Sequence, residues 1–142
     1  KFSVKEKMDN IDLIRTWVPS VPHTSNFNRL RSHFGFVFSS FLGSLKVNNF
    51  DIIISMNPNL FSFLPSLFCH YIRRREIIRN VDDLWPEIFY DLGIVKSKFL
   101  KTILDFFAYI SYNIPKMIIP VSEGYVNTIT NKYTTKIRAG IH

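Results

Sequence analysis

Apolar residues along the chain alternate between short β-branched runs and longer stretches with helical spacing. The short runs predict strands, because β-branched and aromatic side chains favour extended backbone. Five strands are expected, over residues 11–18, 50–55, 76–81, 117–121 and 136–141. The run Ile52, Ile53, Ile54 is continuously apolar, which is typical of a strand buried on both faces. Residues 1–8 are charged and weakly patterned, and predict an edge hairpin arm or a frayed end.

The longer stretches repeat apolar residues every three or four positions, which is the period of an α-helix. They predict helices over residues 26–46, 60–72, 84–92, 97–113 and 122–131. Ser97 and Ser122 stand where N-cap residues are expected. Strands and helices that alternate in this way predict parallel strands joined by right-handed crossovers. The expected fold class is therefore α/β, a Rossmann-like, doubly wound and mainly parallel sheet within a single domain over residues 1–142.

Composition limits the alternatives. At 142 residues, 46% hydrophobic and 20% charged, the chain suits one folded domain with a real core. Its net charge of +7 favours anionic partners such as phosphates, nucleotides, nucleic acid or an acidic membrane. The single Cys69 excludes an internal disulfide and agrees with a reducing compartment. No signal peptide is expected, and Pro58 and Pro65 interrupt the most apolar region, so no spanning helix is expected either.

The densest group of acidic and aromatic residues lies at a predicted junction of strand and helix, residues 80–87. Asp82 and Asp83 follow the strand, where open α/β sheets bind ligands. A carboxylate there is suited to act as a general base on a hydroxyl, or to bind a sugar hydroxyl. Alternatively, Asp83 caps the helix, with Pro86 in its first turn and Glu87 at the positive end of its dipole. Trp85 is then a core residue rather than a stacking platform.

Four segments carry a resemblance to a known family. Residues 83–87 are DLWPE, followed by LG at 92–93; the others are DIIIS at 51–55 with Pro58, IIPVSEGY at 118–125 and KIRAGIH at 136–142. In this order they resemble the motifs of glycosyltransferase family 4, in particular the DLWPE-type enzymes that build surface polysaccharides and glycolipids. That family has the GT-B architecture, in which two Rossmann-like domains face each other across a cleft.

The resemblance implies an acceptor-side domain that ends near the interdomain hinge. It implies transfer of a sugar from a nucleotide sugar, as substrate, to a hydroxyl of a saccharide or glycolipid, with no cofactor and no metal. Asp82 and Asp83 are then the catalytic candidates near the acceptor, because the predicted strand ends converge on one edge. The remaining acceptor-binding candidates in the same cleft are Asn57, Trp85, Glu87, Ser122 and Glu123.

The chain also departs from the family. The family's opening strand with its Gly-rich turn, its second strand and its donor domain have no counterpart in the sequence. Asp82 stands where many members have His or Arg, and Ala139 and His142 replace the usual Asn and Asp at the hinge. The resemblance therefore implies a partial domain, which alone is not expected to catalyse transfer. Most of the donor contacts would come from the domain that is missing.

Basic residues near the apolar helices suggest a surface for anionic lipid. The candidates are Arg29, Arg31, Arg73, Arg74 and Arg75; alternatively they are solvated charges on core helices. The expected location is cytoplasmic, or peripheral on the inner face of the cell membrane. Two rival functions remain: a non-catalytic module or split-gene half that needs a donor-domain partner, and a basic nucleic-acid-binding domain. The dispersed positive charge argues against the second. The four histidines lack metal-ligand spacing.

Overall fold

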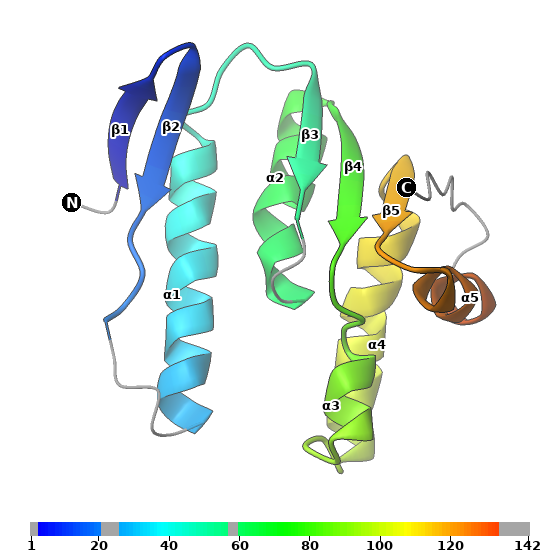
Figure 1. Cartoon of the computed structure of the whole chain (residues 1–142). Coiled ribbons are helices and arrows are strands. Elements are labelled where there is room, and N and C mark those ends of the chain that lie inside the picture. The colour runs from blue at the N-terminus through cyan, green and yellow to red at the C-terminus, as the bar shows by residue number, and fades with distance from the viewer. Residues whose placement is uncertain (1–2, 21–25, 57–59, 134–142) are drawn as a thin grey trace.

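The computed structural model describes residues 3–20, 26–56 and 60–133, without the side chains of residues 26, 27, 29 and 30. Two strands, a helix and a further strand come first, and helices and strands alternate from there (Figure 1). In chain order the elements are β1 (Ser3–Met8), β2 (Ile11–Thr16), α1 (Asn26–Ser44), β3 (Ile52–Ser55), the 3₁₀ turn η1 (Leu60–Ser62), α2 (Phe63–Arg73), β4 (Glu76–Val81), α3 (Glu87–Asp91), α4 (Lys98–Asn113), β5 (Met117–Pro120) and α5 (Glu123–Lys132).

The strands form two separate sheets. β3, β4 and β5 make a parallel sheet in that order, whereas β1 and β2 make an antiparallel hairpin. The mixed α/β class is thus confirmed, as is a hairpin arm over the charged amino-terminal residues. The prediction of one sheet containing all five strands is wrong for residues 11–16, because β2 pairs only with β1 among the described strands. The predicted strand at 136–141 lies outside the described residues.

Helices cover one face of the three-stranded sheet. Along β4, Ile77, Arg79 and Val81 are buried, and the Arg79 guanidinium lies over the rings of Phe63 in α2 and Tyr112 in α4. On the opposite face Ile54 is 69% exposed. Figure 1 accordingly shows the strands in one layer, with α1, α2 and α4 behind them. The second helical layer that a doubly wound sheet requires is not seen in the described part of the chain.

The hydrophobic core lies around β4, β5, α4 and α5. Its buried members come from distant parts of the chain and bury apolar area that stabilises the fold: Leu60, Val81, Val95, Leu104, Ala108, Tyr112, Ile118, Ile129 and Tyr133. The Tyr112 and Tyr133 rings are 4.9 Å apart and join α4 to the end of α5. The core therefore holds the carboxyl ends of β4 and β5 in place.

The hairpin packs on α1 through small residues. Ser39 is fully buried and its hydroxyl donates to the Trp17 carbonyl oxygen. A Cβ atom on Gly43 would lie 2.6 Å from Thr16 Cγ2, so this position requires glycine for close approach. Gly35, Ser39 and Gly43 are spaced four residues apart and lie on one side of the helix. Close backbone contact, rather than large interlocking side chains, holds this part together.

Candidate functional site

The carboxyl ends of β4 and β5 lie side by side, and the segments that follow them carry polar side chains (Figure 1). Val81 pairs with Pro120 in the parallel register, and the Val121 amide donates a 3.3 Å hydrogen bond to the Val81 carbonyl oxygen. Asp82 follows this junction in one segment and Ser122 in the other. The sequence prediction that these strand ends share one edge is therefore confirmed for β4 and β5.

The two aspartates occupy different environments. Asp82 is exposed and accepts a 2.7 Å hydrogen bond from the Asn80 side-chain amide, which holds the carboxylate beside the end of β4. Asp83 is half-buried. Both carboxylates lie just beyond the carboxyl end of β4, and neither lines the two apolar hollows near α1 and α2. The exposed carboxylate of Asp82 is accessible to a hydroxyl-bearing molecule from solvent.

The alternative interpretation, that Asp83 caps the following helix, is wrong. α3 begins at Glu87 and its N-cap residue is Pro86, so Asp83 lies three positions before the cap. Residues 82–86 instead form bends and a turn between β4 and α3, in which the Ile88 amide donates a 3.1 Å hydrogen bond to the Leu84 carbonyl oxygen.

Trp85 packs into the core, as the alternative interpretation of the sequence held. Its ring lies 4.5 Å from Phe89 in an edge-to-face arrangement, and the Tyr112 hydroxyl donates a 3.1 Å hydrogen bond to its carbonyl oxygen. The indole Nε1 is buried and has no hydrogen-bond partner among the described residues. Trp85 therefore anchors the segment after β4 to the core through Phe89 and Tyr112.

Glu87 joins three helices rather than lying beside Asp82. Its Oε1 accepts a 2.6 Å hydrogen bond from the Tyr133 hydroxyl and pairs with Lys132 Nζ at 3.0 Å. Lys132 also pairs with Asp105 on α4 at 3.2 Å, and the Tyr90 hydroxyl donates to the same carboxylate at 3.1 Å. This polar network links α3, α4 and α5, and the side chain of Glu87 is only 15% exposed.

The network shifts the protonation of its members. Burial raises the pKa of Tyr133, and the hydrogen bond to Glu87 raises it further. Burial likewise raises the pKa of Tyr90, with Asp105 adding to the effect. Burial lowers the pKa of Lys132, but the carboxylates of Glu87 and Asp105 outweigh it and the net shift is upward. The network therefore stays protonated on its hydroxyls and charged on its lysine at neutral pH.

Ser122 and Glu123 begin α5. The Ser122 hydroxyl accepts a hydrogen bond from the Tyr125 amide and caps the helix, as the sequence predicted. Glu123 is exposed in the first turn, where a carboxylate is favourable for the helix dipole. The remaining cleft candidate, Asn57, lies outside the described residues.

The basic candidates divide into two groups. Arg31 lies near the start of α1, whereas Arg73, Arg74 and Arg75 are exposed at the end of α2. The two helices run in the same direction (Figure 1), so the two groups lie at opposite ends of the helical layer. Arg73 donates a 3.2 Å hydrogen bond to Asn48. The side chain of Arg29 lies outside the described part.

The sequence analysis missed Arg79. This residue is fully buried in β4, and its guanidinium lies 4.5 Å from the centre of the Phe63 ring. Burial lowers its pKa to about 10, although Tyr112 acts in the opposite direction. The sequence did contain a signal for its burial. Alternate residues of a strand lie on the same face, so Arg79 shares a face with the apolar Ile77 and Val81. Arg79 fills the space between α2 and α4 with a charged side chain.

Other features of a site are not found among the described residues. No group of His, Cys, Asp and Glu there could hold a metal ion, and none of the helices described is long and apolar enough to cross a membrane. Two apolar hollows lie between α1, α2 and β3. The first adjoins the amino end of β3, away from Asp82. No family model, curated protein or solved structure matches the chain.

Proposed function

We propose that the chain is the acceptor-side part of a GT-B glycosyltransferase, and that the edge formed by the ends of β4 and β5 receives the acceptor. The observation that carries the proposal is the hydrogen bond between Val121 and Val81. It joins the two strand ends and so brings the segments of Asp82 and Ser122 together. Ligands of open α/β sheets bind beyond the carboxyl ends of such strands.

The chemistry of the edge suits a hydroxyl-bearing acceptor. Carboxylates accept charge-assisted hydrogen bonds from sugar hydroxyls, and one of them can remove the proton from the attacking hydroxyl. Asp82 is the more accessible of the two aspartates and has its orientation set by Asn80. We therefore assign it the general-base role and assign Asp83 to acceptor binding. Glu123, exposed at the start of α5, would contact the acceptor farther along the edge.

Two of the acceptor-binding candidates, Glu87 and Trp85, have structural roles instead of a direct contact with the acceptor. Glu87 is engaged by Tyr133 and Lys132, and Trp85 packs against Phe89. Their proposed contribution is to hold the segment after β4 in place. The same proposal includes a Rossmann-like fold for the complete domain. It also includes a nucleotide sugar as the donor and a saccharide or glycolipid as the acceptor. So is peripheral association with the inner face of the cell membrane.

The arginines constrain any membrane contact. Arg73, Arg74 and Arg75 immediately precede β4, so they lie at the amino end of this strand and the aspartates lie beyond its carboxyl end. If these arginines bind anionic lipid, the acceptor site faces away from their contact surface.

A turnover measurement tests the proposal. The chain is joined to a domain that binds nucleotide sugars, and the rate of sugar transfer is compared among variants. Replacing Asp82 and Asp83 together by Asn should lower kcat by at least about 100-fold, because loss of a general base has this size of effect. Asp91→Asn removes an exposed carboxylate at the end of α3 and should leave kcat unchanged. Unchanged kcat in the double variant would contradict the assignment.

A further inference from the structure

The connection between α3 and α4 exposes a group of large apolar side chains. Leu92 and Ile94 are each more than half exposed, and Phe99 in the first turn of α4 is 76% exposed. Leu100, which follows it, is exposed as well. We call these four residues the α4 corner. All of them lie within nine positions of the chain, so they form one local surface.

The backbone holds the α4 corner in one conformation. The Ile94 amide donates a 3.0 Å hydrogen bond to the Phe89 carbonyl oxygen, and the next residue, Val95, is buried in the core. The Ser97 hydroxyl accepts a hydrogen bond from the Leu100 amide and caps α4. The apolar side chains are therefore directed to solvent by a fixed framework, and a partner would bind them with little cost of ordering.

Lysines stand between these apolar residues. Lys96 and Lys98 are exposed, and neither belongs to an ion pair among the described residues. Lys101 is partly buried, with its Nζ 5.1 Å from the centre of the Tyr90 ring. Exposed apolar side chains beside lysines are typical of segments that lie at a lipid interface. Lysine stems can lie along apolar surface there while their charges reach the headgroups.

The acidic residues nearby do not cancel this positive charge. Residues 91–101 contain the three lysines and a single carboxylate, that of Asp91, which is exposed. Glu87 and Asp105 both pair with Lys132 of α5, at 3.0 and 3.2 Å. Their charges are thus engaged on the side of α3 and α4 that faces α5. The α4 corner keeps a net positive charge beside its apolar side chains.

We propose that the α4 corner enters the headgroup layer of an anionic membrane, with Lys96 and Lys98 on the lipid phosphates. The inference names the surface for the membrane association included in the proposed function, and rests on that part of it. Figure 1 shows α3 and the start of α4 beyond the carboxyl end of β4. Contact through the corner therefore turns the acceptor edge towards the membrane, where a glycolipid acceptor would be held. Contact through Arg73, Arg74 and Arg75 would turn it away.

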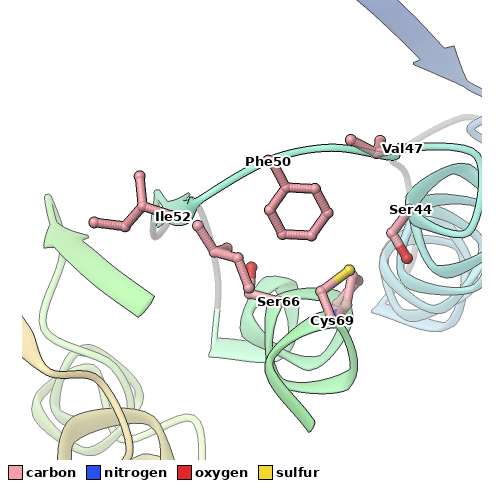
Figure 2. Close-up of a pocket in the computed structure, with 8 residues that line it drawn as sticks. Ser44, Val47, Phe50, Ile52, Ser66 and Cys69 are labelled. Atoms are coloured by element: carbon pink, nitrogen blue, oxygen red, sulfur yellow. The ribbon is translucent and has the colours of Figure 1, made fainter. Parts of the chain in front are cut away.

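Charge and shape favour this partner over others. A second copy in a symmetric contact would bring the same lysines together, and like charges repel. Nucleic acid would meet the lysines, but the aliphatic Leu92 and Ile94 offer no ring on which bases could stack. The hollow between α1, α2 and β3 in Figure 2, into which the Phe50 ring points, is apolar but lined by uncharged residues. It lacks the cations that bind lipid phosphates.

Vesicle co-sedimentation at physiological ionic strength measures the contact. Binding should be stronger to vesicles of phosphatidylcholine and phosphatidylglycerol in equal parts than to phosphatidylcholine alone. Lys96→Gln with Lys98→Gln should weaken binding to the anionic vesicles by about 25-fold, because each lysine near such a surface contributes about 5-fold. Ile94→Ser with Phe99→Ser should weaken it by at least about 10-fold, through loss of apolar burial.

A matched control removes the same charge elsewhere. Arg74→Gln with Arg75→Gln acts on exposed residues after α2 and should weaken binding by less than about 3-fold, because charges beyond a Debye length are screened. Equal losses in the lysine and arginine variants would overturn the proposal, as would binding without preference for anionic vesicles or no binding. Asp82→Asn with Asp83→Asn should still bind vesicles, so failure of lipid binding is separable from failure of the acceptor site.

A polarity-sensitive dye reports whether the α4 corner itself enters the lipid. The dye is attached to Phe99→Cys in a chain that also carries Cys69→Ser, and its emission should shift to the blue on anionic vesicles. The same dye on Phe38→Cys, a position on α1 that is more than half exposed, should not shift. A shift at position 38 alone would overturn the proposal. A shift at position 99 that grows with chain concentration without vesicles would also overturn it, because a second copy would then cover the corner.

Discussion

The two halves of the molecule differ in how completely their apolar side chains are covered. The closed half, consisting of β4, β5, α3, α4 and α5, buries Ile118, Ile129 and Tyr112 almost entirely. The open half, consisting of the β1–β2 hairpin, α1 and the free edge of β3, leaves Phe38 and Ile54 more than half exposed. Both halves are rich in apolar residues, so composition does not explain the difference. The closed half also leaves Phe99 and Phe106 of α4 exposed, so what distinguishes it is the buried core cluster, whose members other than Leu60 all lie between Val81 and Tyr133.

The largest expected effect is a difference between the two halves in how much the loss of one apolar side chain lowers the free energy of unfolding. Ile118→Ala removes a side chain that is 1% exposed, and should lower the free energy of unfolding by about 2–5 kcal/mol. Phe38→Ala removes a larger side chain from the open half, yet should cost less than about 1 kcal/mol because that ring is already mostly in water. Urea unfolding of both variants measures the contrast. Equal costs would show that the open half is as well packed as the closed half.

The polar network of the closed half should give the next largest effect. Glu87→Ala leaves the Tyr133 hydroxyl without its acceptor and should cost about 1.5–3 kcal/mol, as expected for a partly buried hydrogen bond to a charged group. Glu76→Ala removes an exposed ion pair with Lys116 and should cost at most about 1 kcal/mol. A double-mutant cycle of Glu87→Ala with Tyr133→Phe isolates the pair. Additive costs would contradict a direct interaction.

The contact between the hairpin and α1 can be tested by replacing glycine residues with alanine. Gly43→Ala would place a Cβ atom 2.6 Å from Thr16 Cγ2, and should destabilise the open half by about 1–3 kcal/mol through overpacking. Gly124→Ala in α5 meets only the Ser122 hydroxyl at 3.9 Å, so it should stabilise the protein by about 0.5–1 kcal/mol through helix propensity. Amide exchange in β1 and β2 reports the first change. Unaltered exchange in Gly43→Ala would argue against close docking.

Alkaline pH should produce the smallest effect, and it should act on the closed half. Because their pKa values are raised in the fold, Tyr90 and Tyr133 keep protons above pH about 10 that the unfolded chain loses. The pKa of Lys132 is also raised, so its stabilising charge is lost as pH rises through the folded value. Arg79, with a pKa lowered to about 10, opposes the trend because the folded chain releases its proton first.

Stability should therefore fall slightly above pH about 10. The measurement is the urea midpoint at neutral and alkaline pH, together with tyrosinate absorbance before and after unfolding. A midpoint that stays constant or rises with pH would contradict the shifts of the tyrosines and Lys132.

The sequence predicted the closed half well because local signals and tertiary packing agree there. The β-branched residues of β4 and the serine caps of α4 and α5 predicted elements that the structure contains. The junction of β4 and β5 also followed from the general geometry of parallel strands. Arg79 was missed because its burial depends on the rings of Phe63 and Tyr112, which are distant in sequence.

The open half was predicted less well, because its pairing depends on long-range choices. β-branched residues at 11–16 predict a strand but do not specify which strand it pairs with. In the structure this strand pairs with its neighbour β1 in an antiparallel hairpin. Two features of the closed half were also missed. The start of α3 was placed too early, because this helix begins at Glu87, after Pro86. The engagement of Glu87 by Tyr133 joins residues 46 positions apart, a separation that no local pattern conveys.

The most direct test of the account is an NMR titration of the isotope-labelled chain with a panel of short saccharides. The account predicts that an acceptor shifts the amide signals of residues 82–83 and 122–123, at the edge of the closed half. Asp82→Asn combined with Asp83→Asn should abolish these shifts, whereas Asp91→Asn should preserve them. Shifts confined to α1 and β3, or shifts that persist in the double aspartate variant, would contradict an acceptor site at the ends of β4 and β5.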